Sequence, residues 1–285
     1  MTTRAVVLVS CVVATGGCVD GPELGTASSE LDVSAFVLPS LPDAERAQIV
    51  HAYDRLDPSD EVPRGMLEDA IIYFDLNIPL IPKTKYFAIA DFSRHSGMDR
   101  YWLVDTTTGA VEAHKVAHGD GSDPDNNGTA TLFGNVDGSH RTSLGFYLSG
   151  EIYDGTHAHS MRLDGLSVDG SPNGMANTNA RDRLIVMHEA SYVADDNITQ
   201  QGRSNGCLAL DPAIEVSMVD RIHDGTLIYA AISSLNPPVG RCTGSNPSVE
   251  DPDEEPDESG GCSTSGGSPG LLLGLAFVLT RRKRR

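Results

Sequence analysis

Cys207 and His188 are the residues of this chain best suited to chemistry. His188 ends the apolar run 184–187, and Cys207 follows it by nineteen residues at the end of a Ser-x-Gly turn. A thiolate is a strong nucleophile, and a neighbouring imidazole generates it by accepting the thiol proton. The pair therefore predicts a cysteine nucleophile, Cys207, with His188 as its general base. A structural cysteine beside a core histidine is the alternative that the spacing leaves open.

The residues just before Cys207 favour an active-site turn. Gly206 allows a sharp bend and a close approach of the backbone to a substrate. Ser204 and Asn205 complete the turn, whose backbone N–H groups are suited to stabilising an oxyanion. We expect Arg203, directly before the turn, to line the cleft.

Hydrophobic periodicity predicts two helices followed by many short strands. The helices cover 43–56 and 63–76, where apolar residues recur at helical spacing. The candidate strands are 86–92, 101–105, 111–117, 145–152, 160–163, 184–188 and 227–232. Asp211 and Pro212 mark the start of a further helix that ends near His223. The sequence thus predicts a mostly β domain with few helices, preceded by a short helical segment.

Seven short motifs between residues 84 and 233 add a second line of evidence. They cover 91–93, 100–105, 116–122, 142–147, 161–165, 186–190 and 202–207. Taken in this order, they resemble the murein L,D-transpeptidase catalytic domain family, a branch of the YkuD-like peptidoglycan enzymes. The resemblance implies a YkuD-like L,D-transpeptidase β-sandwich. It also places His118 and His159 in family-like motifs, so we expect both to line the cleft, and an ordinary polar role is the alternative for each.

The resemblance implies a cysteine acyltransferase that needs no cofactor and acts on peptidoglycan stem peptides. Cys207 would attack the carbonyl of the third stem residue, and the terminal D-alanine would leave a thioester behind. An amine of a neighbouring stem would then resolve the thioester into a 3→3 cross-link. Water in place of the amine would make the enzyme an L,D-carboxypeptidase. A wall-binding surface module without catalysis is the alternative from another class.

Two positions depart from the family pattern. Asn205 stands where many relatives have a second histidine. Ala209 stands where many have an arginine, two residues after the cysteine, that helps to hold the substrate. The nucleophile and the base are therefore present, whereas the means of holding the substrate differs.

Both ends of the chain are similar to targeting segments. The apolar stretch 5–14 is too short to span a bilayer comfortably and is typical of a secretory signal. Residues 15–18 resemble a lipoprotein box, so either lipidation of Cys18 or ordinary signal cleavage follows. At the other end, a small-residue motif at 261–266, an apolar run at 271–279 and five basic residues resemble the MYXO-CTERM sorting signal. A simple tail anchor is the alternative there.

These features divide the chain into six segments and place the protein at the cell envelope or surface. We expect a signal peptide over 1–17, a tether over 18–42, a helical segment over 43–83, the catalytic domain over 84–233, an acidic linker over 234–260 and a sorting or anchor segment over 261–285. Contact with a membrane would come through a lipid on Cys18 or through the C-terminal segment. The sequence leaves the oligomeric state open.

The charge balance excludes nucleic acid as a partner. The chain has 40 acidic and 21 basic residues, with a net charge of −19, and such a surface repels phosphates. The proline-broken acidic run 250–258 cannot bury a core and is a solvated spacer. Cys242 and Cys262 flank this run. Either they pair in an oxidising compartment or sorting consumes Cys262, and the sequence leaves both outcomes open.

Two patterns are similar to metal sites but lack the full set of ligands. Residues 123–128 resemble the opening of a calcium loop, yet the twelfth position is Gly134 in place of glutamate. His157 and His159 share one face of a strand, but no further ligands accompany them. We therefore predict no metal.

Overall fold

A computed structural model describes residues 31–168, 171 and 174–233. The expected signal peptide with Cys18, most of the tether, the acidic linker with Cys242, and the C-terminal segment with Cys262 lie outside these residues. Contacts divide the chain into two units, and every described residue belongs to the first, Met1–Pro238. Within the described ranges, no helix is both long enough and apolar enough to cross a membrane.

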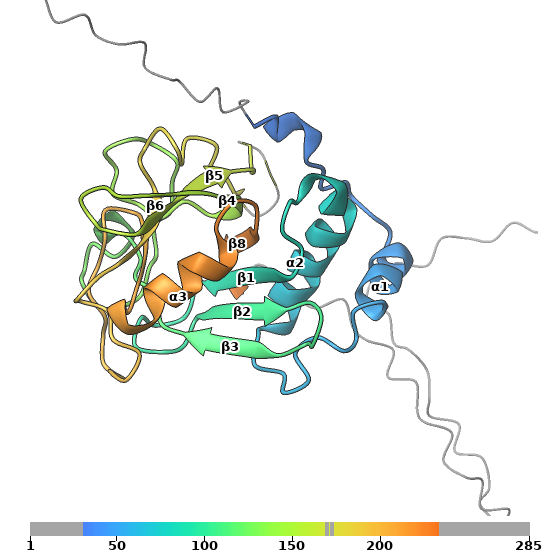
Figure 1. Ribbon diagram of the computed structural model, residues 1–285, viewed down its shortest axis with the longest axis horizontal. Coiled ribbons are helices and arrows are strands. Elements are labelled where there is room, and N and C mark those ends of the chain that lie inside the picture. The colour runs from blue at the N-terminus through green and yellow to red at the C-terminus, as the bar shows by residue number, and fades with distance from the viewer. Residues whose placement is uncertain (1–30, 169–170, 172–173, 234–285) are drawn as a thin grey trace, which may run out of the picture. The chain divides into compact units, whose positions relative to one another are not determined.

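Eight strands of the described chain pair into one mixed sheet (Figure 1). They are β1 Tyr86–Asp91, β2 Tyr101–Asp105, β3 Val111–His114, β4 Gly145–Tyr153, β5 Ser160–Gly165, β6 Val186–Glu189, β7 Leu208–Leu210 and β8 Leu227–Ala231. The order across the sheet is β3-β2-β1-β8-β4-β5-β6-β7. Neighbours are antiparallel except for β1 with β8 and β6 with β7, which are parallel. This arrangement confirms the predicted mostly β fold.

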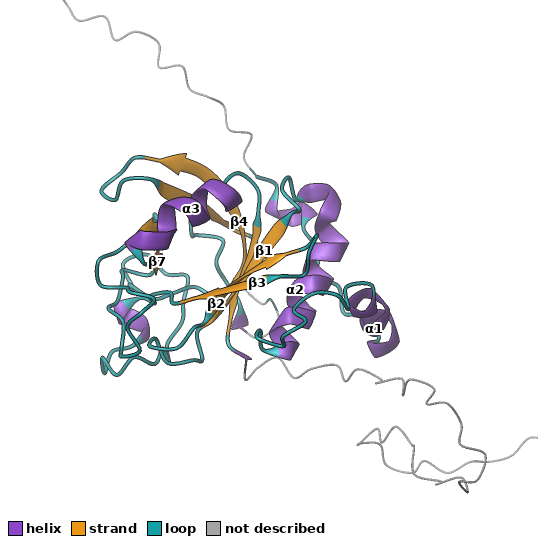
Figure 2. Ribbon diagram, turned by 60° about the horizontal axis from the view of Figure 1, so that its bottom comes forward, coloured by secondary structure: helices purple, strands orange, loops and turns teal. Residues whose placement is uncertain are grey.

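Few helices accompany the sheet. They are α1 Asp43–His51, α2 Arg64–Asn77 and α3 Pro212–Ile222, with short 3-10 turns η1 Val33–Ala35, η2 Ile78–Leu80 and η3 Asp120–Ser122. Figure 2 shows α2 and α3 on different sides of the central strands. The sheet is therefore covered on both sides, which explains why β1 and β8 are buried along nearly their whole length.

Helix α2 packs on β1 and β8 through the face that its periodicity predicts. Met66, Ile71 and Phe74 on this face are all buried. Tyr73 stacks on Phe146 of β4 with ring centroids 3.7 Å apart, and Phe146 stacks on Tyr229 of β8 at 4.2 Å. Each such aromatic pair adds about 0.5–1.5 kcal/mol beyond the area it buries. The stack thus joins α2 firmly to the middle of the sheet.

Helix α3 begins where the sequence predicts. The carboxylate of Asp211 accepts a hydrogen bond from the N–H of Ala213 at 2.7 Å, and Pro212 occupies the first helical position. The helix buries Met218 and Ile222 and contacts β6. It therefore supports the strand that carries His188.

The differences from the predicted boundaries have local causes. The helix predicted to reach Leu56 ends at His51, because the chain turns after Ala52. The strand predicted from Leu184 begins at Val186, because Leu184 has a φ of 55°, a left-handed conformation that a strand does not accommodate. Strand β7 has three residues and carries too little pattern to be predicted.

Candidate active site

The parallel pairing of β6 with β7 brings Cys207 and His188 onto one face of the sheet. His188 lies opposite Ala209, and Met187 lies opposite Leu208. Cys207 directly precedes β7, so the same register places it opposite Val186. Side chains alternate along a strand, so Cys207 shares its face with His188. Strand spacing and rise put the two Cα atoms about 8 Å apart, a gap that two facing side chains span.

The ring of His188 is held by the backbone of the next residue. Its Nδ1 lies 2.6 Å from the carbonyl oxygen of Glu189. A carbonyl can only accept, so Nδ1 carries the proton and Nε2 keeps a lone pair. The ring of His157 stacks on that of His188, with centroids 3.9 Å apart and planes at 22°. The imidazole is thus fixed in the tautomer that a general base requires.

Burial tunes His188 toward its neutral form. The burial of the side chain lowers the pKa of His188 below 6.5, and the electrostatic interaction with His157 acts in the same direction. The hydrogen bond to Glu189 raises that pKa in part. At neutral pH the ring is therefore uncharged and able to accept a proton.

Cys207 carries a half-buried free thiol. Its Sγ lies 3.7 Å from the carbonyl oxygen of Leu184. Burial raises the pKa of the Cys207 thiol, whereas the backbone N–H of Val186 and the charge of Arg183 lower it. Because the burial effect is the largest, the thiol needs a base to become a nucleophile.

Ser204 ties the turn before Cys207 together. Its hydroxyl donates to the carbonyl of Cys207 at 2.7 Å and accepts from the N–H of Gly206 at 3.1 Å. Its own N–H donates to the carbonyl of His118 at 2.9 Å, and its carbonyl accepts from the N–H of Asp120 at 2.8 Å. The turn is therefore fixed internally and also attached to the segment around residue 119.

Position 206 requires a glycine. Its φ is 110°, in the region that side chains disfavour. A Cβ atom there would lie 2.9 Å from the carbonyl oxygen of Arg141 and 3.1 Å from the side chain of Ile185. Asn205 beside it is exposed. The backbone directly before Cys207 thus packs tightly against Arg141 and Ile185.

His118 and Arg203, two of the three residues expected to line the cleft, instead support the turn before Cys207. His118 is fully buried, with Nδ1 2.8 Å from the Nη2 of Arg100 and Nε2 3.4 Å from the carboxylate of Asp123. Arg203 donates to the carbonyl of Asp123 at 2.5 Å. The third, His159, pairs with Asp220 of α3 at 2.9 Å. His118 therefore lies inside the fold, where its own carbonyl accepts the hydrogen bond from the N–H of Ser204.

The loop that resembles a calcium site uses its carboxylate internally. Asp123 accepts from the N–H groups of Asn127 and Gly128 at 3.0 and 2.9 Å. Within the described residues, no group of three or more histidine, cysteine, aspartate or glutamate side chains is placed to hold a metal ion. Backbone N–H groups of the loop thus bind both carboxylate oxygens of Asp123.

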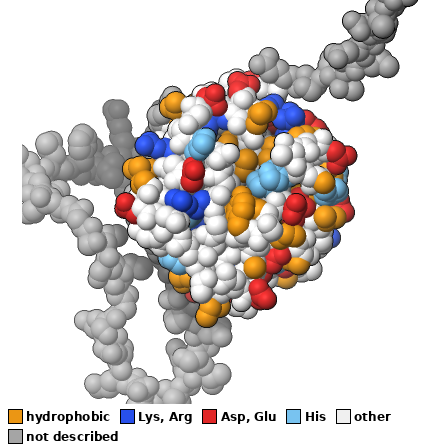
Figure 3. All heavy atoms as spheres, turned by 90° about the vertical axis from the view of Figure 1, so that its left-hand side faces the viewer, with side chains coloured by type: hydrophobic (Ala, Val, Ile, Leu, Met, Phe, Trp, Pro, Cys, Tyr) orange, Lys and Arg blue, Asp and Glu red, His pale blue; other side chains and the backbone are white. Residues whose placement is uncertain are grey.

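One face of the protein mixes imidazole and apolar groups. Figure 3 shows histidine side chains beside hydrophobic ones on the face that lies at the left of Figure 1.

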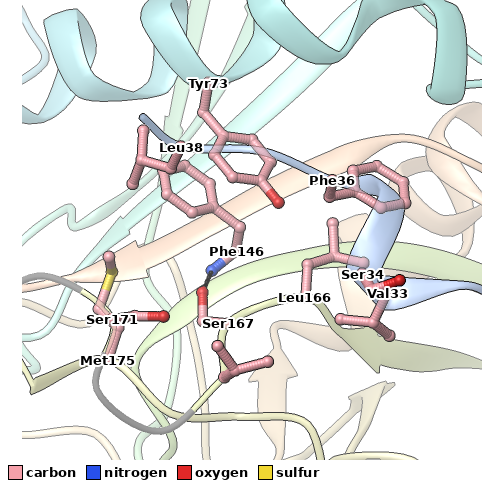
Figure 4. A pocket seen from close by; sticks show the side chains of 11 residues that line it. Val33, Ser34, Phe36, Leu38, Tyr73, Phe146, Leu166, Ser167, Ser171 and Met175 are labelled. Carbon is pink, nitrogen blue, oxygen red and sulfur yellow. Dashed lines mark hydrogen bonds between the residues drawn. The ribbon is translucent and has the colours of Figure 1, made fainter. Parts of the chain in front are cut away.

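A separate cavity of about 440 Å³ is lined by Phe36, Tyr73, Phe146 and Met175 (Figure 4). Phe146 points into it, so Tyr147, the next residue of β4, faces the other way. The cavity therefore lies across β4 from the face that Tyr147 occupies.

Sequence reasoning missed two side chains of this site. The sequence pattern indicates only a metal-ligand role for His157, whereas it lies in the segment between β4 and β5 and stacks on His188 of β6. Arg183 precedes the strand of His188, where it looks like an ordinary solvated residue. No local pattern signals either contact, because each joins segments that only the folded chain brings together.

The family pattern of the L,D-transpeptidase catalytic domain matches residues 59–231, more than half of the chain. The chain therefore belongs to this family, and its fold is the YkuD-like L,D-transpeptidase fold. The match begins before α2, so the family's domain includes the helix that completes the core.

Solved structures of L,D-transpeptidases are also similar. One from Mycobacterium smegmatis shares 12% sequence identity with a TM-score of 0.32, over 51% of this chain and 58% of that one. L,D-transpeptidase 1 from Mycobacterium tuberculosis shares 12% identity with a TM-score of 0.28, over 51% and 61%. The chain thus spans about three fifths of the length of these relatives. No curated protein matches it.

The buried His118 should make the stability of the protein depend on pH. Burial, followed by the charge of Arg100, lowers the pKa of His118 from 6.5 to about 4. Between these values the unfolded chain binds a proton that the folded chain does not. The free energy of unfolding should therefore lose this contribution as the pH falls from 6.5 toward 4.

Denaturant unfolding of the wild type and His118→Gln at pH 7 and pH 5 measures this effect. The glutamine variant should lose less stability between the two pH values than the wild type does. His51→Gln, at an exposed histidine, is the control and should match the wild type. Equal losses in the wild type and His118→Gln would show that His118 makes no such contribution.

Proposed function

We propose that this chain is a peptidoglycan L,D-transpeptidase-like cysteine acyltransferase that forms 3→3 cross-links between stem peptides. Membership of the family supports this function. The observation that carries it is the register of β6 and β7, which puts a free thiol and a neutral imidazole on one face. No cofactor takes part in the proposed reaction.

The first half of the reaction forms a thioester on Cys207. His188 accepts the thiol proton at Nε2, and the thiolate attacks the carbonyl carbon of the third stem residue. The resulting imidazolium returns the proton to the amine of the terminal D-alanine as the amide bond breaks. D-alanine leaves, and the acyl group of the stem remains on sulfur.

The second half transfers the acyl group to an amine. The amine of a neighbouring stem attacks the thioester, and His188 accepts its proton. The Cys207 thiolate leaves and regains a proton from the imidazolium, so that the enzyme returns to its starting state. Water in the place of the amine would give trimming of the stem instead of a cross-link.

The backbone of the turn supplies the electrostatic help that acyl transfer needs. We assign the oxyanion to the N–H of Cys207, since Ser204 already binds the N–H of Gly206. A donor held in place before the reaction costs no reorganisation when the oxyanion forms. The hydroxyl of Ser204 also holds the carbonyl of Cys207, which fixes the plane of the peptide that follows the nucleophile.

Export to the cell envelope is part of this proposal. The N-terminal apolar stretch and the C-terminal segment, both outside the described residues, support it. The mature protein should lack residues 1–17 and the tail beyond about Cys262. Intact-mass measurement of protein from the native envelope checks this, and a mature form that keeps residues 281–285 would identify a tail anchor instead.

Incubation with purified tetrapeptide muropeptides tests the activity. Mass analysis should find a dimer with a 3→3 link and released D-alanine in the presence of the wild type. Cys207→Ala should give neither product while folding normally, because a small side chain replaces the thiol. A tripeptide without dimer would make the enzyme a carboxypeptidase, and products from Cys207→Ala would rule out Cys207 as the nucleophile.

His188→Gln should slow the release of D-alanine by about 10²–10⁴-fold, the usual contribution of a positioned acid–base group. In the wild type the rate should fall as the pH drops through the lowered pKa of His188, because the ring then loses its lone pair. The variant should lack this fall. His223→Gln, at the end of α3, is the control and should keep the wild-type profile. An unchanged profile in His188→Gln would exclude it as the base.

A further inference from the structure

The family's usual arginine has no room in this chain. Ala209 occupies that position and is fully buried. It belongs to a small apolar cluster with Ala117, Ala190 and Val193. A guanidinium at this point would be buried among alkyl groups without hydrogen-bond partners, at a large cost in free energy. Position 209 therefore supplies no positive charge near the nucleophile.

Arg183 brings such a charge from the segment before β6. Its Nη1 donates to the carbonyl of Gly134 at 3.0 Å and to the hydroxyl of Ser143 at 2.5 Å. Its Nη2 donates to the carbonyl of Arg141 at 2.8 Å. Neutral oxygens thus hold the guanidinium, and none of these bonds is to a carboxylate that would cancel its charge.

Two backbone carbonyls connect Arg183 to the nucleophile turn. The carbonyl oxygen of Arg141, which binds Arg183, is also the atom that a Cβ at Gly206 would meet at 2.9 Å. The residue after Arg183 is Leu184, whose carbonyl oxygen lies 3.7 Å from the Sγ of Cys207. The guanidinium is therefore held against the same backbone that positions the thiol.

The guanidinium also keeps one unused donor. The Nε of Arg183 is buried and has no hydrogen-bond partner among the described residues. Burial lowers the pKa of Arg183, while Tyr147, Asp137 and Cys207 raise it in that order. An arginine remains protonated in proteins, so its charge acts on its surroundings at every working pH.

We propose that Arg183 is a positioning residue that holds the Cys207 turn and stabilises the thiolate with a fixed positive charge. The inference rests on the proposed role of Cys207 as nucleophile. It predicts a property of the thiol itself, which is measurable without any peptidoglycan substrate.

The other titratable groups near the thiol do not supply this charge. Tyr147 on β4 and Tyr192 after β6 both interact with Cys207, and burial raises the pKa of each to about 12. They stay neutral over the range in which a thiol titrates. His188 on β6 is charged only below its lowered pKa. Arg183 is thus the fixed cation in this set.

The pH dependence of Cys207 alkylation in the full chain tests the proposal. Iodoacetamide reacts with the thiolate, so the midpoint of the rate against pH reports the pKa of the thiol. The chain has five cysteines, so mass spectrometry should follow the peptide that contains Cys207. A role limited to folding would change the rate at all pH values and leave the midpoint in place.

Arg183→Gln should raise the midpoint by about one pH unit, the low end of the effect of a nearby opposite charge. Arg183→Lys, which keeps the charge, should stay close to the wild type. The control is Arg181→Gln, two residues away, whose guanidinium binds Glu151 and Asp164. This variant should also keep the wild-type midpoint.

An unchanged midpoint in folded Arg183→Gln would overturn the proposal. If that variant does not fold, the lysine variant decides, because a rise of one unit with the charge retained contradicts the inference. Muropeptide turnover by the wild type separates the two proposals. A shifted midpoint without turnover would reject the proposed function alone, and turnover with an unshifted midpoint would reject the role of Arg183 alone.

Discussion

The short parallel ladder between β6 and β7 is the constraint on which the site depends. It places Cys207 and His188 on one face through three residue pairs. Two supports hold the ladder in place: α3 packs on β6, and Ser204 attaches the turn before β7 to the segment around residue 119. A one-residue slip of the register would turn the two side chains to opposite faces, so the surrounding bonds preserve the chemistry by preserving the register.

Burial sets the electrostatics of the pair. It lowers the pKa of His188 and raises that of Cys207, so both changes favour the neutral thiol and imidazole in the resting protein. In the proposed reaction, the thiolate forms when the proton moves to His188, close to the moment of attack. The stacked ring of His157 and the fixed bond to Glu189 hold the base during this transfer. The charge of Arg183 acts against burial and lowers the pKa of the Cys207 thiol, so that His188 can accept the thiol proton more easily.

The sequence was informative wherever a property is local. Short sequence patterns predict the apolar face of α2, the cap at Asp211 and the central strands. They also predict that the cysteine at 207 and the histidine at 188 belong together. The rest depends on contacts between distant segments. The left-handed Leu184 gives no sequence signal, and His118 looks like a cleft residue until the fold encloses it beside Arg100. Arg183 lies in the turn before β6 and joins the site only because β6 pairs with β7.

The most direct measurement of the central claim is a mass analysis of the enzyme itself after rapid acid quenching with a tetrapeptide donor and no acceptor amine. The account predicts an adduct on the peptide that contains Cys207, equal to the stem acyl group without its terminal D-alanine, and sensitive to hydroxylamine as a thioester is. Release of D-alanine without any adduct on Cys207, or an adduct on another residue, would contradict it.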